Sequence, residues 1–238
     1  MDTAEAEKKL NDLLLNGIAK EIFAADQAKA LAETIGKNSP VINDNGFGVL
    51  FGTLQNVLSD HQTLAVAKIY DPPSSRYPTR SIPATLSLLE EFHGLWSLPE
   101  RFILEDLIIS DGNNETAIVR DMSNQDLSTA VVARFNKGLP AVGKSNCVLS
   151  SALKIVRNAR DKVHAHNEAV EKAVRKLPTW GEVELLVNYA KDFMCVIGRG
   201  YLGTHFGNNS DDYLLAWDAR RVSKMMDKVI QRAVLERD

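Results

Sequence analysis

The strongest constraint on the fold is an apolar heptad repeat between residues 149 and 177. Two adjacent rows recur every seven positions, and the spacing between them alternates between three and four, which is typical of a helix packed against other helices. The first row is Leu149, Val156, Val163, Val170 and Leu177, and the second is Ala152, Ala159, His166 and Ala173. We call these two rows the apolar seam and expect one long helix from about Ser145 to Lys176. His166 is the only polar residue of the seam, so it has either a partner or a function.

Helical spacing of apolar residues also dominates the rest of the chain. It predicts helices over about 3–35, 47–70, 81–92, 95–109, 123–135, 180–196 and 211–235. Only Thr116 to Arg120 has some strand character, and Gly198, Gly200 and Gly203 are expected to form a flexible connection. Because no other stretch alternates like a strand, the sequence predicts an all-α protein.

Several residues indicate where these helices begin and end. Asp71 followed by Pro72 and Pro73 should end the helix that starts near Phe47. Ser81 is a suitable N-cap for the next helix, which tolerates Pro83 in its first turn.

Composition narrows the class of protein. The chain has 238 residues, of which 45% are hydrophobic and 25% are charged, as in an ordinary globular protein. Its formal net charge is −3, so any nucleic acid must bind to a local positively charged patch. The acidic start lacks the apolar region of a secretory signal, and no run approaches the roughly 18 apolar residues of a membrane span. Cys147 and Cys195 do not have the spacing of metal ligands, and we expect both to be reduced and to serve packing. We therefore expect a cytoplasmic protein without membrane contact, metal or cofactor.

The segment from Arg157 to Asn167 concentrates the residues most suited to chemistry. Arginine binds phosphate geometrically, and histidine transfers protons near neutral pH. On a regular helix His164 lies about 20° from Arg157 and about 40° from Arg160, whereas His166 lies about 120° from Arg160. His164 and His166 diverge by about 200° and cannot share one metal ion. A purely structural interpretation also exists, with solvated arginines and a hydrogen bond from His166 across the seam.

The string Arg160-Asp161-Lys162-Val163-His164-Ala165-His166 resembles the signature of the HEPN superfamily, an arginine and a polar residue followed by histidine after four to six intervening positions. The wider segment is similar to the AbiU-type branch of abortive-infection proteins, as are Asp71 with its Pro-Ser loop and the Ser81-Ile82-Pro83 helix start. The resemblance implies one domain over residues 1–238, an HEPN-like helical bundle. Its core spans about 47–201, with additional helices at about 3–35 and 211–235.

The resemblance further implies a homodimer through the motif helix and a metal-independent endoribonuclease that leaves a 2′,3′-cyclic phosphate. Such a protein acts in phage defence by abortive infection, or as a toxin. In that picture Arg160 holds the scissile phosphate, and His166 activates the ribose 2′-hydroxyl or protonates the leaving oxygen. Asp161 orients one of them. Lys154 and Lys162 flank the seam and would bind the RNA substrate.

Two alternatives stay open at this point. Arg157 and Asn158 with His164 also satisfy the motif, with six intervening residues. We prefer Arg160 and His166 because the Ala-His-Asn ending fits that register and because the seam explains the histidine. The second alternative is a catalytically silent dimerisation or RNA-binding module with the same fold. Under either reading an antitoxin or other regulator is a further expected partner.

Overall fold

The computed structural model describes residues 2–111, 115–139, 148–161, 177–206 and 214–235. The helices are α1 (Thr3–Leu13), the π-helix η1 (Leu14–Ala19), α2 (Lys20–Lys37), α3 (Ser39–Asp44), α4 (Gly48–Ile69), α5 (Ile82–Glu91), α6 (Arg101–Ser110), α7 (Thr116–Arg120), α8 (Asn124–Gly138), α9 (Val148–Ala159), α10 (Trp180–Leu202) and α11 (Leu214–Leu235). The described residues contain no strand, which confirms the all-α prediction.

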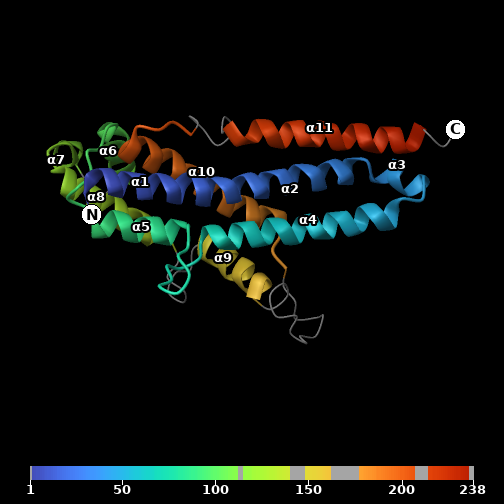
Figure 1. Cartoon of the computed structure of the whole chain (residues 1–238), viewed down its shortest axis with the longest axis horizontal. Coiled ribbons are helices and arrows are strands. Elements are labelled where there is room, and N and C mark those ends of the chain that lie inside the picture. The colour runs from blue at the N-terminus through green and yellow to red at the C-terminus, as the bar shows by residue number, and fades with distance from the viewer. Residues whose placement is uncertain (1, 112–114, 140–147, 162–176, 207–213, 236–238) are drawn as a thin grey trace.

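The helices form an elongated bundle with two core clusters (Figure 1). α1, η1 and α2 follow one another along the long axis, with α4 and α11 beside α2 at one end. α5 to α8 gather at the other end, and α10 packs against α4, α6 and α9. The main cluster fills this second end and the middle. The smaller cluster lies between α2, α3, α4 and α11, and its buried residues are Ile35, Ile42, Phe51 and Ile230.

Local sequence signals account for several helix ends. Ser81 accepts a hydrogen bond from the backbone nitrogen of Ala84, and Pro83 lies in the first turn of α5, as the sequence predicts. α10 begins with a capping box in which Thr179 and Glu182 each bind the other's backbone. No helix among the described residues combines the length and the apolar character that crossing a membrane requires.

Two expectations from the sequence are wrong. Thr116–Arg120 forms helix α7 and not a strand, because its buried side chain, Val119, packs into the main cluster. Gly198 and Gly200 lie inside α10 and are not a flexible connection. A Cβ on Gly198 would approach Phe206 within 2.2 Å, and one on Gly200 would approach Leu104 within 2.4 Å. These glycines therefore serve close packing.

Gly203 has φ 60° and ends α10 in the left-handed region that favours glycine.

Among the described residues of the apolar seam, Ala152, Val156 and Ala159 are buried as expected, at most 1% exposed, while Leu149 is partly buried against the main cluster. Leu177 departs from the pattern, since it lies before α10 and is 54% exposed. The remaining seam residues, 163, 166, 170 and 173, lie outside the described residues.

Candidate functional site

The described part of the sequence motif ends in Arg160 and Asp161, which directly follow α9 in a π-type turn. The Arg160 guanidinium donates from Nε to Oδ1 of Asp161 at 2.7 Å and from Nη1 to Oδ1 of Asp71. Its Nη2 makes no hydrogen bond to the described part of the chain. The Arg160 side chain is 24% exposed, and two carboxylates fix its plane while Nη2 has no partner among the described residues.

Arg157, one turn earlier on α9, binds the residue next to Asp71. Its Nη2 donates to the backbone oxygen of Tyr70 at 2.6 Å. Tyr70 is fully buried, and its hydroxyl donates to the backbone oxygen of Leu186 in α10 at 2.6 Å. The C-terminal end of α4 is thus held between α9 and α10, and two consecutive residues receive the two motif arginines.

Burial and the neighbouring carboxylates shift the pKa values of the two arginines in opposite directions. Burial lowers the pKa of Arg157, although the charge of Asp71 opposes this. Burial alone would also lower the pKa of Arg160, but its hydrogen bonds to Asp161 and Asp71 outweigh burial and the pKa is raised. Arg160 is therefore a firmly cationic group, and its charge is locally compensated by two carboxylates.

The loop from residue 71 to 81 positions Asp71 through contacts at its far end. The Ser81 hydroxyl donates to the backbone oxygen of Asp71 at 2.6 Å. Arg80 forms an ion pair with Asp12 of α1 at 2.8 Å, and its hydrogen bond lowers the pKa of Asp12. A Cβ on Gly17 would lie 2.3 Å from Cβ of Arg80. The π-helix η1 therefore has a glycine at a point where the loop approaches it closely.

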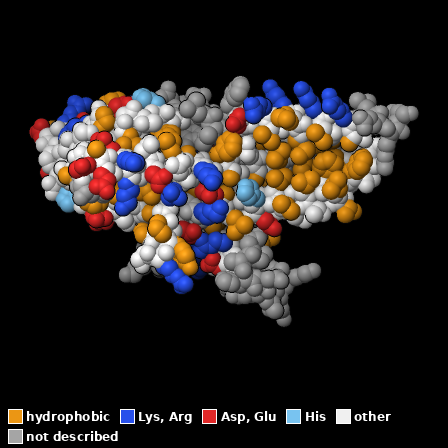
Figure 2. Space-filling view, viewed as in Figure 1, with side chains coloured by type: hydrophobic (Ala, Val, Ile, Leu, Met, Phe, Trp, Pro, Cys, Tyr) orange, Lys and Arg blue, Asp and Glu red, His pale blue; other side chains and the backbone are white. Residues whose placement is uncertain are grey.

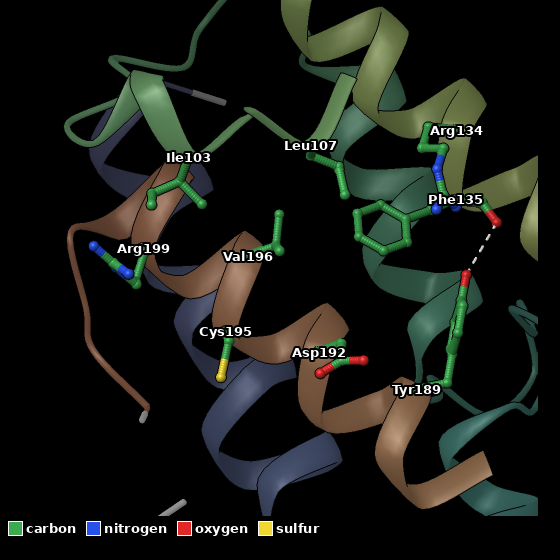
Figure 3. Close-up of a pocket in the computed structure, with 9 residues that line it drawn as sticks. All are labelled: Ile103, Leu107, Arg134, Phe135, Tyr189, Asp192, Cys195, Val196 and Arg199. Atoms are coloured by element: carbon green, nitrogen blue, oxygen red, sulfur yellow. Dashed lines mark hydrogen bonds between the residues drawn. The ribbon is translucent and has the colours of Figure 1, made fainter. Parts of the chain in front are cut away.

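A cavity of about 410 Å³ lies elsewhere, between α6, α8 and α10 (Figure 3). The arginines at its wall are already paired, Arg134 with Asp111 at 2.6 Å and Arg199 with Glu100 at 2.7 Å. Burial raises the pKa of the Cys195 thiol, so this thiol is not an activated nucleophile. We assign no chemistry to this cavity. Across the described residues no three histidine, cysteine or acidic side chains lie together as metal ligands would.

The structure brings together only some of the residues that the sequence singled out. Arg160 and Asp161 join Asp71, while Lys154 and Asn158 are exposed on α9. His164, His166 and Lys162 lie outside the described residues, and Cys147 does too.

Sequence reasoning missed the direct partners of the two arginines. Asp71 stood out in the sequence as the residue before two prolines, which marked it as a helix end and not as the partner of Arg160. Nothing in the sequence indicated the backbone oxygen of Tyr70 as the acceptor for Arg157.

Comparison with known proteins gives one match, to the family model HEPN AbiU2, described as AbiU2, over residues 12–222. Neither the curated proteins nor the solved structures include one that matches the chain. The matched range contains α2 to α10 and therefore the whole described site.

Proposed function

Because the chain belongs to the AbiU2 family of HEPN proteins, we propose that it is a metal-independent endoribonuclease that acts in phage defence by abortive infection, or as a toxin. The observation that carries this proposal is the fixed guanidinium of Arg160. A cation whose plane is set by Asp71 and Asp161, with Nη2 unpaired within the described part of the chain, is suited to bind one phosphate oxygen in a defined direction.

In the proposed reaction the ribose 2′-oxygen attacks the adjacent phosphorus and the bond from phosphorus to the 5′-oxygen breaks. The products are a 2′,3′-cyclic phosphate and a 5′-hydroxyl. Arg160 stabilises the negative charge that develops on the phosphate. His166 removes the proton of the 2′-hydroxyl or donates one to the leaving 5′-oxygen. DNA is not a substrate because it lacks the 2′-hydroxyl.

The proposed assembly is a cytoplasmic homodimer through the motif helix, in which two copies of the motif face each other. Lys154, exposed on α9, and Lys162 contact the RNA backbone. Binding through lysines weakens with salt because each neutralised phosphate releases counterions. An antitoxin or other regulator is a further proposed partner.

The second candidate is a catalytically silent member that keeps the fold as a dimerisation or RNA-binding module. Its support comes from the same site, since both motif arginines already have intramolecular partners. The formal net charge of −3 also lacks the excess of positive charge that is typical of RNA-binding surfaces. In this case Arg157 and Arg160 serve mainly to hold α9 against α4.

The test is cleavage of a mixed-sequence RNA by the purified protein in excess EDTA, beside Arg160→Ala, His166→Ala and His164→Ala. Arg232→Ala, an exposed arginine on α11, is the matched control. We expect cleavage to be lost in Arg160→Ala and His166→Ala and kept in His164→Ala and the control. Loss in His164→Ala with activity in His166→Ala would select the register of Arg157, Asn158 and His164. A folded wild type that cuts nothing favours the silent module.

A further inference from the structure

The helices α2, α4 and α11 form a single layer at one end of the molecule (Figure 1). α2 is the middle helix. Gln55 of α4 donates to the backbone oxygen of Ala32 at 3.1 Å on one side, and Thr34 hydrogen-bonds Ser223 of α11 at 2.6 Å on the other. The core of this layer is the smaller cluster of four buried residues. Protein domains normally consist of at least two packed layers. A single layer with so small a core is therefore expected to pack against another protein surface.

One face of this layer is apolar and open to solvent (Figure 2). On α2, Leu31 lies about 160° around the helix from Lys29, which binds Glu184 of α10 on the opposite face. Helical spacing gathers the apolar residues of α4 on one side of that helix and those of α11 on one side of theirs, and Figure 2 shows hydrophobic side chains gathered over this end of the molecule. We call this surface the arm face; it comprises Leu31, Leu50, Leu54, Val57, Val222, Met225, Met226 and Val229. Four of its members are strongly exposed, namely Leu50 at 58%, Val57 at 59%, Met225 at 59% and Val229 at 57%.

The size of the arm face suits a stable interface. Three helices spaced 8–10 Å apart are about 28 Å wide, and the 14 residues of α4 from 48 to 61 are about 21 Å long. The flat area is therefore on the order of 600 Å² before side-chain relief is added, against about 800 Å² that each partner buries in a standard interface. An apolar surface of this extent lies at the upper end of the largest patches on typical monomers, and such patches often bind a partner.

Charged residues border the arm face on one edge only. Arg221, Lys228 and Arg232 lie within about 60° of Met225 on α11, and all three are exposed. Along α4 the stretch from Gly48 to Gln62 contains a single charged residue, Asp60. The apolar centre with a charged rim is the usual anatomy of a protein interface.

We propose that the arm face binds the arm face of a second copy of this chain, in a contact separate from the motif helix. A second copy offers a layer of the same length and helix spacing, and most soluble oligomers are symmetric pairs of identical surfaces. The basic residues at the edge of α11 favour one of the two possible twofold arrangements. A twofold axis parallel to the helices places α11 of each copy over α4 of the other, which keeps the two basic edges apart. The other axis in this plane would bring both basic edges together.

This arrangement has a definite register. The contacts of α2 with both neighbours place Met225 level with Leu50, because Thr34 pairs with Ser223 and Ala32 with Gln55. A rotation about an axis parallel to the helices does not change the position of any residue along the helix axes. Met225 of one copy therefore packs near Leu50 of the partner subunit.

The first test is the association state of the full chain, measured by sedimentation equilibrium over a range of concentrations. Leu50→Glu and Met225→Glu each place a charge in the proposed contact between α11 of one copy and α4 of the other. Ile118→Glu on α7, where Ile118 is 56% exposed, is the matched control. We expect both arm-face variants to raise the dissociation constant at least about tenfold, while the control equals the wild type. Circular dichroism establishes that each variant is folded.

The second test is disulfide cross-linking in a Cys147→Ser, Cys195→Ser background. A mixture of Leu50→Cys and Met225→Cys chains should form a covalent dimer, and neither chain alone should do so efficiently. Cross-linking of Met225→Cys with itself would overturn the arrangement. An association state that is the same in the wild type and both glutamate variants would overturn the proposal.

Such an association would then be held by another surface, such as the motif helix. A wild-type monomer would equally overturn the proposal and leave the face to a different, acidic partner. RNA cleavage does not enter these measurements, so the proposed nuclease can fail without affecting them.

Discussion

Arg160 and Asp71 are 89 positions apart in the sequence, and their side chains form an ion pair that joins the end of α9 to the end of α4. Asp71 is itself held at its backbone oxygen by Ser81. In the proposed reaction the carboxylate is thus a positioning group for Arg160, which acts through the guanidinium and does not itself contact the RNA.

Asp71→Asn should therefore impair the proposed cleavage without unfolding the protein. We expect kcat to fall by about 10- to 100-fold with little change in KM, because small misplacements of a catalytic group cost rate on this scale. Steady-state kinetics on a defined RNA measure the effect. Asp106→Asn, an exposed carboxylate on α6, is the control. A wild-type kcat in Asp71→Asn would show that the ion pair does not serve the reaction.

Gly17→Ala should destabilise the protein by about 1–3 kcal/mol, because overpacking forces backbone shifts. The added methyl would meet Arg80 at both its Cβ and its backbone oxygen, at 2.3 and 2.7 Å. Gly52→Ala in α4 is the matched control, since a Cβ there meets nothing within 4 Å. That substitution should stabilise by about 0.5–1 kcal/mol through helix propensity. Urea denaturation compares the two, and equal stabilities would contradict the close contact.

Ser128 and Tyr201 form a fully buried hydrogen bond of 2.9 Å between α8 and α10. Removing one partner leaves the other hydroxyl buried without its bond, so Tyr201→Phe and Ser128→Ala should each cost about 1–3 kcal/mol. The double variant should cost less than the sum of the two. A double-mutant cycle by urea denaturation measures this coupling, and additive losses would argue against the bond.

Asp192→Asn should raise the melting temperature at neutral pH and not at low pH. Burial raises the pKa of Asp192 above its ordinary value of 3.8, and the charge of Lys191 opposes this only in part. A folded-state pKa above the unfolded one means that ionisation destabilises the fold. This penalty is present above the folded pKa and disappears as the pH falls below 3.8.

Because Asp192 is only partly buried and keeps contact with solvent, the gain should be no more than about 2 °C. Calorimetry at pH 7 and pH 3 tests it. A gain of equal size at both values would point to a cause other than the charge.

Much of the fold could be predicted because helix signals are local. The cap at Ser81, the stop before Pro72 and the spacing of apolar residues each depend on a few neighbouring residues. The errors came where distant contacts decide the outcome. Thr116–Arg120 is helical because of how Val119 packs, and Gly200 is small because Leu104 lies against it.

The candidate site was predicted in part for the same reason. Arg160 and Asp161 are neighbours within a motif and could be named from sequence. The partners Tyr70 and Asp71 come from another helix, and only the tertiary structure brings them to α9. The arm face could not be predicted, because periodicity finds an apolar stripe on a helix such as α4 without showing what covers it.

The π-helix η1 has a consequence for how relatives of this chain can change. α1, η1 and α2 follow one another without a break from Thr3 to Lys37. A π-turn holds one residue more than an α-turn, so deleting one residue between 14 and 19 would leave a regular α-turn and keep the faces that α1 and α2 present to the core nearly unchanged. The point at which Gly17 meets Arg80 would move. We therefore expect the helical rod to tolerate a one-residue deletion here, and the loop from residue 71 to 81 to shift with it.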